Sequence, residues 1–249
     1  MKKLQLYLLL IAFGILIINS CKRTTETFQS DQLTDYMQLQ SGKYITYRLD
    51  SFVIFNFGTQ GTIHSYLAKD VIDTIITDNL GRPSWRVIRF LSDTSGTDSW
   101  TPVDTYMITP TRETIEVVES NMRFQKLKLP IINGFTWKGN TYIDTHSATS
   151  DVTYLDDWDY TYDSVGSPFT VLNGTIPNCI TIHQRDDSTG DPADSLVYSS
   201  RTYSEEVYGK GVGLIYKNFI YWQYQPPNGG NAVGSKKGYG IKLDMIDHN

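Results

Sequence analysis

From Gly42 to the end of the chain, polar and apolar residues alternate, and this period of two constrains the fold more than any other feature. In the segment YITYRL (44–49), every second side chain would point to the same side, because successive side chains of a strand face opposite ways. Turn-forming residues separate such segments, as at Asp78–Pro83 and at Ser120-Asn121. We see no amphipathic helix of ordinary length after Gly42. The pattern predicts an all-β protein of about a dozen strands in consecutive antiparallel pairs.

An antiparallel meander of this length forms a curved sheet, a half-barrel or a sandwich, and alternation alone does not choose among them. No internal repeat is visible, so a single β-domain over residues 42–249 is the most economical interpretation. The alternative is two small β-domains that meet near the polar segment Ser147–Asp151.

One hairpin carries a specific turn signal. In VLNGTI, apolar residues flank Asn173-Gly174, which predicts a type I′ turn because both of its central residues need a positive φ. Pro177 follows closely and has no N–H to donate to a neighbouring strand. Its strand should therefore lie at a sheet edge or carry a bulge.

The first 20 residues have the features of a secretory signal peptide. Lys2 and Lys3 precede an apolar run from Leu4 to Ile18, which is shorter than the roughly 20 residues that a membrane-spanning helix needs. The run ends in Ile18-Asn19-Ser20-Cys21, which resembles the lipobox of bacterial lipoproteins. The alternative is an ordinary signal peptide that happens to contain a cysteine.

The lipobox resemblance implies that Cys21 is acylated and becomes the mature N-terminus. Acyl chains would hold the protein on a membrane without crossing it, and the polar residues 21–41 would be the lipidated tether. Lys22 and Arg23 follow the cysteine, so neither an acidic export run nor an aspartate retention signal is present. By this resemblance the protein is expected in the outer membrane, facing the periplasm.

Composition excludes several classes of function. A net charge of −5 and a pI near 5.3, without a basic stripe, argue against nucleic acid as a partner. With Cys21 acylated, Cys179 has no disulfide partner, and its apolar neighbours predict a buried, inert thiol. The sequence has no GxSxG motif, and its four histidines are widely spaced. Gly209–Ile215 lacks the spacing of a nucleotide-binding loop. We therefore predict no catalytic residues, no metal and no cofactor.

Two aromatic strands are candidates for a ligand-binding face. In DDWDYTYDS the rings at positions 158, 160 and 162 share one side of a strand, and in FIYWQYQ the rings alternate between both sides. Such rings usually pack in a core. The alternative is a platform for a sugar ring or an acyl chain, and its candidate residues are Trp158, Tyr160, Tyr162, Tyr221, Trp222 and Tyr224.

Two loops deserve a hypothesis of their own. RDDSTGDPAD gathers four carboxylates, and calcium binds such oxygens, although the spacing is not that of an EF-hand and a solvated hairpin tip is the alternative. The carboxylates are Asp186, Asp187, Asp191 and Asp194. The segment Gln225–Gly238 is rich in proline and glycine, so we expect an exposed irregular loop that brings Lys236 and Lys237 beside the aromatic strand.

Several phrases of the β-region resemble lipoproteins of unknown function from Bacteroidota. They are SGKYITYRLDS, MRFQKLKLPIINGFTWKGN, NGTIPNCITI and EEVYGKGVGLIYK. The resemblance implies a lipid-anchored envelope protein and implies no activity, because these motifs are turns and strand ends. We expect a non-enzymatic binding or scaffold module for an amphiphile, a glycan or an envelope protein. The alternative is an envelope hydrolase or glycan-binding protein that uses the aspartates and aromatic residues.

Overall fold

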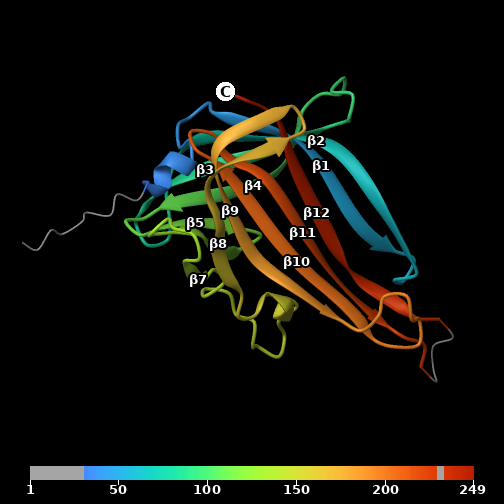
Figure 1. Ribbon diagram of the computed structural model, residues 1–249. Coiled ribbons are helices and arrows are strands. Elements are labelled where there is room, and N and C mark those ends of the chain that lie inside the picture. The colour runs from blue at the N-terminus through green and yellow to red at the C-terminus, as the bar shows by residue number, and fades with distance from the viewer. Residues whose placement is uncertain (1–30, 229–232) are drawn as a thin grey trace, which may run out of the picture.

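The computed structural model describes residues 31–228 and 233–249, and most of them belong to one antiparallel sheet (Figure 1). The twelve strands are β1 (Tyr44–Phe55), β2 (Gln60–Thr77), β3 (Pro83–Ser92), β4 (Thr101–Pro110), β5 (Thr114–Glu119), β6 (Met122–Lys128), β7 (Thr136–Lys138), β8 (Asp159–Val171), β9 (Gly174–Thr189), β10 (Ser199–Gly209), β11 (Gly213–Gln225) and β12 (Ser235–His248). Two short 3₁₀ turns, η1 (Leu33–Tyr36) and η2 (Thr153–Leu155), are the helical elements of the described chain. The prediction of an all-β antiparallel protein is confirmed.

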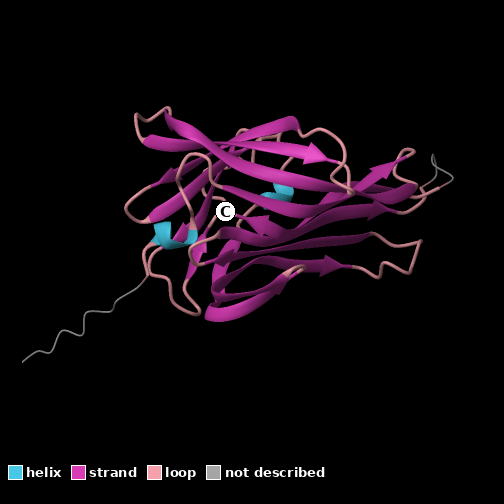
Figure 2. Ribbon diagram, turned by 90° about the horizontal axis from the view of Figure 1, so that it is seen from above, coloured by secondary structure: helices cyan, strands magenta, loops and turns pink. Residues whose placement is uncertain are grey.

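The sheet curls into a nearly closed barrel. Its strand order is β6-β5-β4-β3-β2-β1-β12-β11-β10-β9-β8-β7. Consecutive strands therefore pair with each other except β6 and β7, which end the sheet, and β1 also pairs with β12. Figure 2 shows strands on opposite sides of the molecule around a common interior. The sheet is continuous across Ser147–Asp151, since strands on both sides of that segment belong to it.

The two ends of the sheet, β6 and β7, meet at a seam. The Gln125 N–H donates to the Gly139 carbonyl at 2.8 Å, and the Trp137 indole N–H donates to the Gln125 carbonyl at 2.8 Å. Nearby, the Tyr162 hydroxyl accepts from the Lys128 N–H at 3.0 Å and donates to its carbonyl at 2.8 Å. Backbone and side-chain hydrogen bonds thus complete the closure where the pairing of strands stops. Two of the residues, Trp137 and Gly139, come from the stretch GFTWKGN.

One end of the barrel is filled by the segment that enters it from the N-terminal side (Figure 1). Leu33, Tyr36 and Met37 of this segment are buried and belong to the main apolar cluster. Two contacts hold them: the Gly211 N–H donates to the Asp35 carbonyl at 2.7 Å, and Lys210 forms an ion pair with Asp31 at 2.6 Å. We call residues 33–39 the plug. It covers the barrel end that carries the β10–β11 turn.

The turns show where local signals were right and where they were overridden. The prediction of a hairpin at Asn173-Gly174 is confirmed, but its type I′ geometry is wrong, because Val171 pairs directly with Gly174 and the loop is Leu172-Asn173. Asn173 has no positive φ. Bonds to another strand hold this loop: the Leu172 N–H donates to Asp244, and the Asn173 side chain donates to the Ile246 carbonyl. These tertiary bonds outweigh the local preference.

Other local predictions are confirmed. Ser120 and Asn121 have φ values of 52° and 60°, which is the type I′ pattern, and they join β5 to β6. Pro177 lies where the β8–β9 register breaks, so its strand carries a bulge and is not at an edge. The predicted irregular loop Gln225–Gly238 is shorter than expected, because β12 already begins at Ser235. Within the described part of the chain, no helix has both the length and the apolar character needed to cross a membrane.

Candidate binding cavity inside the barrel

Six charged side chains point into the barrel, where an all-apolar core would be the simpler arrangement. They come from six different strands: Asp70, Arg89, Glu119, Lys126, Glu206 and Lys217. Alternation along each strand turns these positions inward while their chain neighbours face outward. The carboxylates and the cations are equal in number, so the cluster has no net formal charge. We call it the charged cluster.

The first half of the charged cluster joins β2, β3 and β4. Arg89 contacts Asp70 with two parallel hydrogen bonds, each of 2.7 Å, and the Tyr106 hydroxyl donates to the same carboxylate at 3.0 Å. A two-pronged contact of this kind is the strongest geometry for an arginine–carboxylate pair. Arg89 also lies 3.6 Å from Glu119. This part of the cluster is therefore a fixed structural unit.

The second half is less tightly paired. Lys126 contacts Glu206 at 2.6 Å, and the Tyr208 hydroxyl donates to the other oxygen of Glu206 at 2.8 Å. Lys217 lies farther from its carboxylates, at 3.7 Å from Glu119 and 3.8 Å from Glu206. Lys217 thus has ion-pair partners and retains room for a further contact.

The carboxylates of this second half are held in the ionised form. Attraction to Lys217 lowers the pKa of Glu119 from its ordinary value of 4.5 to about 2, against the opposing effect of burial. Burial alone would raise the pKa of Glu206, but Lys126 and Lys217 outweigh it and the net shift is downward. Neither carboxyl can act as a proton donor near neutral pH.

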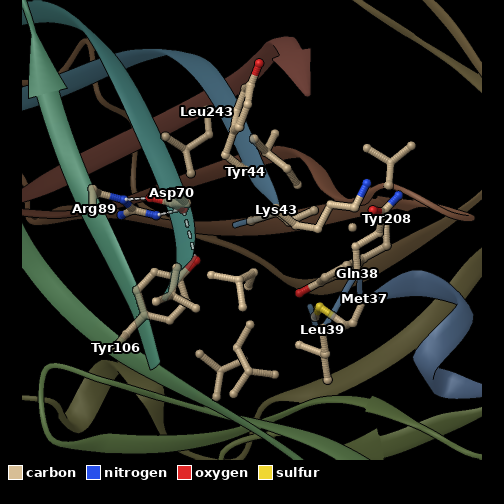
Figure 3. A pocket seen from close by; sticks show the side chains of 18 of the residues that line it. Met37, Gln38, Leu39, Lys43, Tyr44, Asp70, Arg89, Tyr106, Tyr208 and Leu243 are labelled. Atoms are coloured by element: carbon tan, nitrogen blue, oxygen red, sulfur yellow. Dashed lines mark hydrogen bonds and ion pairs between the residues drawn. The ribbon is translucent and has the colours of Figure 1, made fainter. Parts of the chain in front are cut away.

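On one side of the charged cluster lies a cavity of about 80 Å³, which we call the inner cavity. The plug lines it from one side through Met37, Gln38 and Leu39, and the Asp70–Arg89–Tyr106 unit lines it from the other (Figure 3). Aliphatic residues such as Leu243 form much of the remaining wall. This cavity lies between the plug and the charged cluster.

On the other side of the charged cluster lies a cavity of about 150 Å³, which we call the mouth cavity. It shares four residues with the inner cavity, namely Glu119, Lys126, Glu206 and Lys217, so the charged cluster separates the two spaces. Its walls are mainly aromatic and aliphatic: Met122, Phe124, Leu155, Trp158, Tyr160, Phe219, Tyr239 and Ile241. Gln184 and Ser204 add neutral polar groups to the lining. An apolar pocket with a few polar groups is the usual form of a small-molecule site.

The structure divides the six aromatic candidates between the two faces of the sheet. Trp158 and Tyr160 line the mouth cavity and are 2% and 1% exposed, and Tyr162 is fully buried in the same cluster. Tyr221 is stacked on Tyr154 at a ring distance of 3.9 Å. These four residues belong to the main apolar cluster of the barrel.

Trp222 and Tyr224 lie on the outer face, since neighbours along β11 alternate. Lys236 lies 4.2 Å from the Trp222 ring, which places a lysine of the predicted loop beside the aromatic strand. The Tyr224 hydroxyl donates to the Ser195 carbonyl at 2.9 Å. The six residues therefore do not form one continuous face, and we restrict the candidate site to the inward-facing ones.

The four aspartates of the predicted calcium loop each have a separate contact. Asp186 and Asp187 form ion pairs with Arg201 and Arg185, respectively. Asp191 and Asp194 accept backbone N–H groups of Ala193 and Leu196, each at 2.9 Å. Among residues 31–228 and 233–249, no group of three or more His, Cys, Asp or Glu side chains is placed to hold a metal ion.

The two cysteines fall in different parts of the chain. Cys21 lies outside the described residues, so its acylation stays a prediction. Cys179 on β9 is 2% exposed and packs, as predicted, in an apolar cluster that includes Val171 and Val207. Burial raises the pKa of its thiol. A buried thiol of raised pKa is a poor nucleophile.

Sequence reasoning missed the residues that define the cavities. Lys126 and Glu206 are 80 residues apart, and neither carries a motif. One signal was available: Glu205 and Glu206 are adjacent in a predicted strand, so one of the two had to face inward. Gln184 gives no comparable signal, because a lone glutamine in a strand is unremarkable.

Fold and site together define a class of protein: a plugged β-barrel of one antiparallel sheet, with a mixed polar and aromatic cavity inside. The chains of solved structure that are similar to this one include two from Bacteroides and Parabacteroides. The first, a presumed exported protein with a YmcC-like fold from Bacteroides fragilis NCTC 9343, is 8% identical, with a TM-score of 0.38 over 84% of this chain and 97% of that one. The second, a presumed lipoprotein from Parabacteroides distasonis ATCC 8503, is 13% identical, with a TM-score of 0.32 over 84% of this chain and 96% of that one.

Both TM-scores are below 0.5, so neither structure assigns a fold family or an activity to this chain. No protein-family model matches the sequence. No curated protein matches it either.

Proposed function

We propose that this protein is a lipid-anchored module of the cell envelope that binds a small amphiphile in the mouth cavity and performs no chemistry on it. Its place is the periplasmic face of the outer membrane, where Cys21 anchors it. The observation that carries the proposal is the mouth cavity itself, an aromatic-walled space of about 150 Å³ inside the β-barrel. A space of this volume accommodates a group about the size of benzene, so a longer molecule would extend out of it.

The state of the carboxylates favours binding over hydrolysis. A glycosidase needs one carboxyl group that keeps its proton near neutral pH. Glu119 and Glu206, which line the mouth cavity, both have lowered pKa values and cationic partners. They can orient a ligand or hold the fold, but they cannot supply a proton to a leaving group.

Occupying the cavity with a larger side chain tests the proposal. Ile241 lines the mouth cavity, so Ile241→Trp should fill it and weaken binding of 1-monolauroylglycerol at least tenfold. The measurement is equilibrium dialysis below the micelle-forming concentration. The mature chain should carry Cys21→Ala, so that no acyl anchor competes for the cavity.

The matched control is Lys242→Trp, which adds the same side chain at the next position of β12, on the outer face. We expect it to bind the amphiphile like the parent chain. Failure of the parent chain to bind, or equal binding by both tryptophan variants, would refute a ligand site in the mouth cavity.

A further inference from the structure

Gln184 is a buried polar side chain that the fold leaves half satisfied. It is 2% exposed and lines the mouth cavity from β9. The Ser204 hydroxyl donates to its Oε1 at 2.6 Å. Among the described residues nothing accepts a hydrogen bond from its Nε2. A buried N–H without an acceptor destabilises a protein, and a ligand oxygen in the cavity would remove that cost.

The charges around the mouth cavity restrict what that ligand can be. Two carboxylates, Glu119 and Glu206, and two cations, Lys126 and Lys217, line it. Their formal charges cancel, and each has an ionic partner. A charged ligand would therefore lose its hydration without meeting an uncompensated opposite charge, which is unfavourable in a buried site.

The aromatic wall of the mouth cavity restricts the chemistry of the rest of the ligand. Trp158 and Phe219 lie in near-parallel planes in this wall, with ring centroids 6.4 Å apart. Tyr239 continues the wall on β12, and its hydroxyl is already engaged with the hydroxyl of Tyr154 at 3.0 Å. These rings present carbon surface to the cavity, which suits a hydrocarbon chain better than a second polar group.

We infer that the ligand is an uncharged amphiphile whose polar end carries an ester carbonyl or hydroxyl oxygen, and that this oxygen accepts a hydrogen bond from Gln184. The hydrocarbon chain packs along Trp158, Phe219 and Tyr239. This inference rests on the proposed function and adds the chemical class of the ligand and the residue that selects it. Gln184 is the specificity-determining residue of the mouth cavity.

Two probes with the same chain length test this class. We expect the chain carrying Cys21→Ala to bind 1-monolauroylglycerol about tenfold more tightly than laurate, which has a carboxylate in place of the neutral ester. Gln184→Met keeps the length of the side chain and removes both polar atoms. It should weaken 1-monolauroylglycerol about tenfold and leave laurate binding nearly unchanged.

Stability and a matched substitution separate selection from a structural role. Gln184→Met removes the unsatisfied Nε2 donor, but it also removes the acceptor of the buried Ser204 hydroxyl. The substitution is therefore compared in a Ser204→Ala background, where its midpoint of urea unfolding should be no lower than that of Ser204→Ala alone. Gln38→Met makes the same substitution in the inner cavity and should alter neither probe.

The outcomes distinguish the two proposals. If neither probe binds, the proposed function is wrong. If both bind equally, if a neutral sugar such as glucose competes better than the ester, or if Gln184→Met in the Ser204→Ala background loses stability and keeps the preference for the ester, this inference is overturned although the mouth cavity still binds a ligand.

Discussion

At the scale of the residue, the distinctive feature is a set of ion pairs inside a barrel small enough to have had an apolar core. Lys126 and Glu206 are 8% and 1% exposed as side chains, and Tyr208 completes the coordination of the carboxylate. Two charges taken out of water attract each other strongly, but each has lost its hydration. Such a pair contributes little net stability while both partners are present. Removing only one partner lowers the free energy of unfolding, because the other charge stays buried without compensation.

Breaking this pair from one side should therefore destabilise the fold. Glu206→Gln should lower the free energy of unfolding by about 3–5 kcal/mol, because it leaves the buried Lys126 without a carboxylate. Lys126→Met should cost less, because Lys217 remains 3.8 Å from Glu206. The double variant should recover most of the loss, since Lys217 keeps Glu119 as a partner. Urea unfolding of all three chains measures this. Lys138→Met, at an exposed ion pair with Asp159, is the control and should change little. Additive losses in the double variant would show that the two residues do not act as a pair.

The lowered pKa of Glu119 sets a pH dependence of stability. Its pKa is about 2 in the fold and 4.5 in an ordinary setting, so the folded state releases this proton more readily than the unfolded chain. Its contribution is complete above pH 4.5 and is lost as the pH falls toward 2. Glu119→Gln should therefore show a shallower decline of stability over this interval, measured by urea unfolding at a series of pH values. Asp78, whose pKa is also lowered to about 2 by its hydrogen bonds with Arg82, leaves a residual decline in the variant. Parallel curves for the two proteins would contradict this assignment.

At the scale of the element, the strands could be predicted from the sequence, but the closing of the sheet into a barrel could not. Alternation identifies a strand because the two faces of a pleated chain meet different surroundings. The seam depends on the hydrogen bond from the Gln125 N–H to the Gly139 carbonyl. The chain between these two residues makes a turn and contains a cis Leu129-Pro130 bond. Nothing in the local pattern specifies that meeting. The predicted type I′ turn at Asn173-Gly174 is wrong for the same reason, because the loop Leu172-Asn173 is held by hydrogen bonds to β12, far along the chain.

The seam can be opened by a single methyl group. A Cβ at Gly139 would lie 2.5 Å from ring atoms of Tyr160, which is buried and cannot move aside freely. Gly139→Ala should lower the free energy of unfolding by about 1–3 kcal/mol through overpacking. Hydrogen exchange should locate the effect, because the Gln125 amide donates across the seam and should lose protection first. Lys138→Ala, exposed at the neighbouring position, is the control. Unchanged exchange at Gln125 would mean that the seam tolerates the added group.

At the scale of the whole molecule, the plug connects the barrel to its expected anchor. Asp31, where the described chain begins, is held by Lys210 at the plugged end of the barrel. Only nine residues lie between Cys21 and Asp31, and the ten steps from one Cα atom to the next span at most about 36 Å when the chain is fully extended. An acylated Cys21 would thus keep the plugged end near the membrane surface. The sequence predicts the anchor because a lipobox is a local motif. The plug could not be predicted, because the tether was expected to be free of the domain.

The anchor itself is tested by comparing the two cysteines. Cys21→Ala should leave unprocessed precursor in cells and abolish detergent partitioning of the mature form in a phase-separation assay, because no acyl chain can be attached. Cys179→Ala removes the other thiol of the chain, which is buried on β9, and should be processed and partitioned like the parent. Its cost should be confined to stability, on the order of 1 kcal/mol for a small truncation in a packed core. Normal processing and detergent partitioning of the Cys21→Ala protein would mean that residues 1–20 are an ordinary signal peptide. The barrel would then not be held to the membrane through this residue.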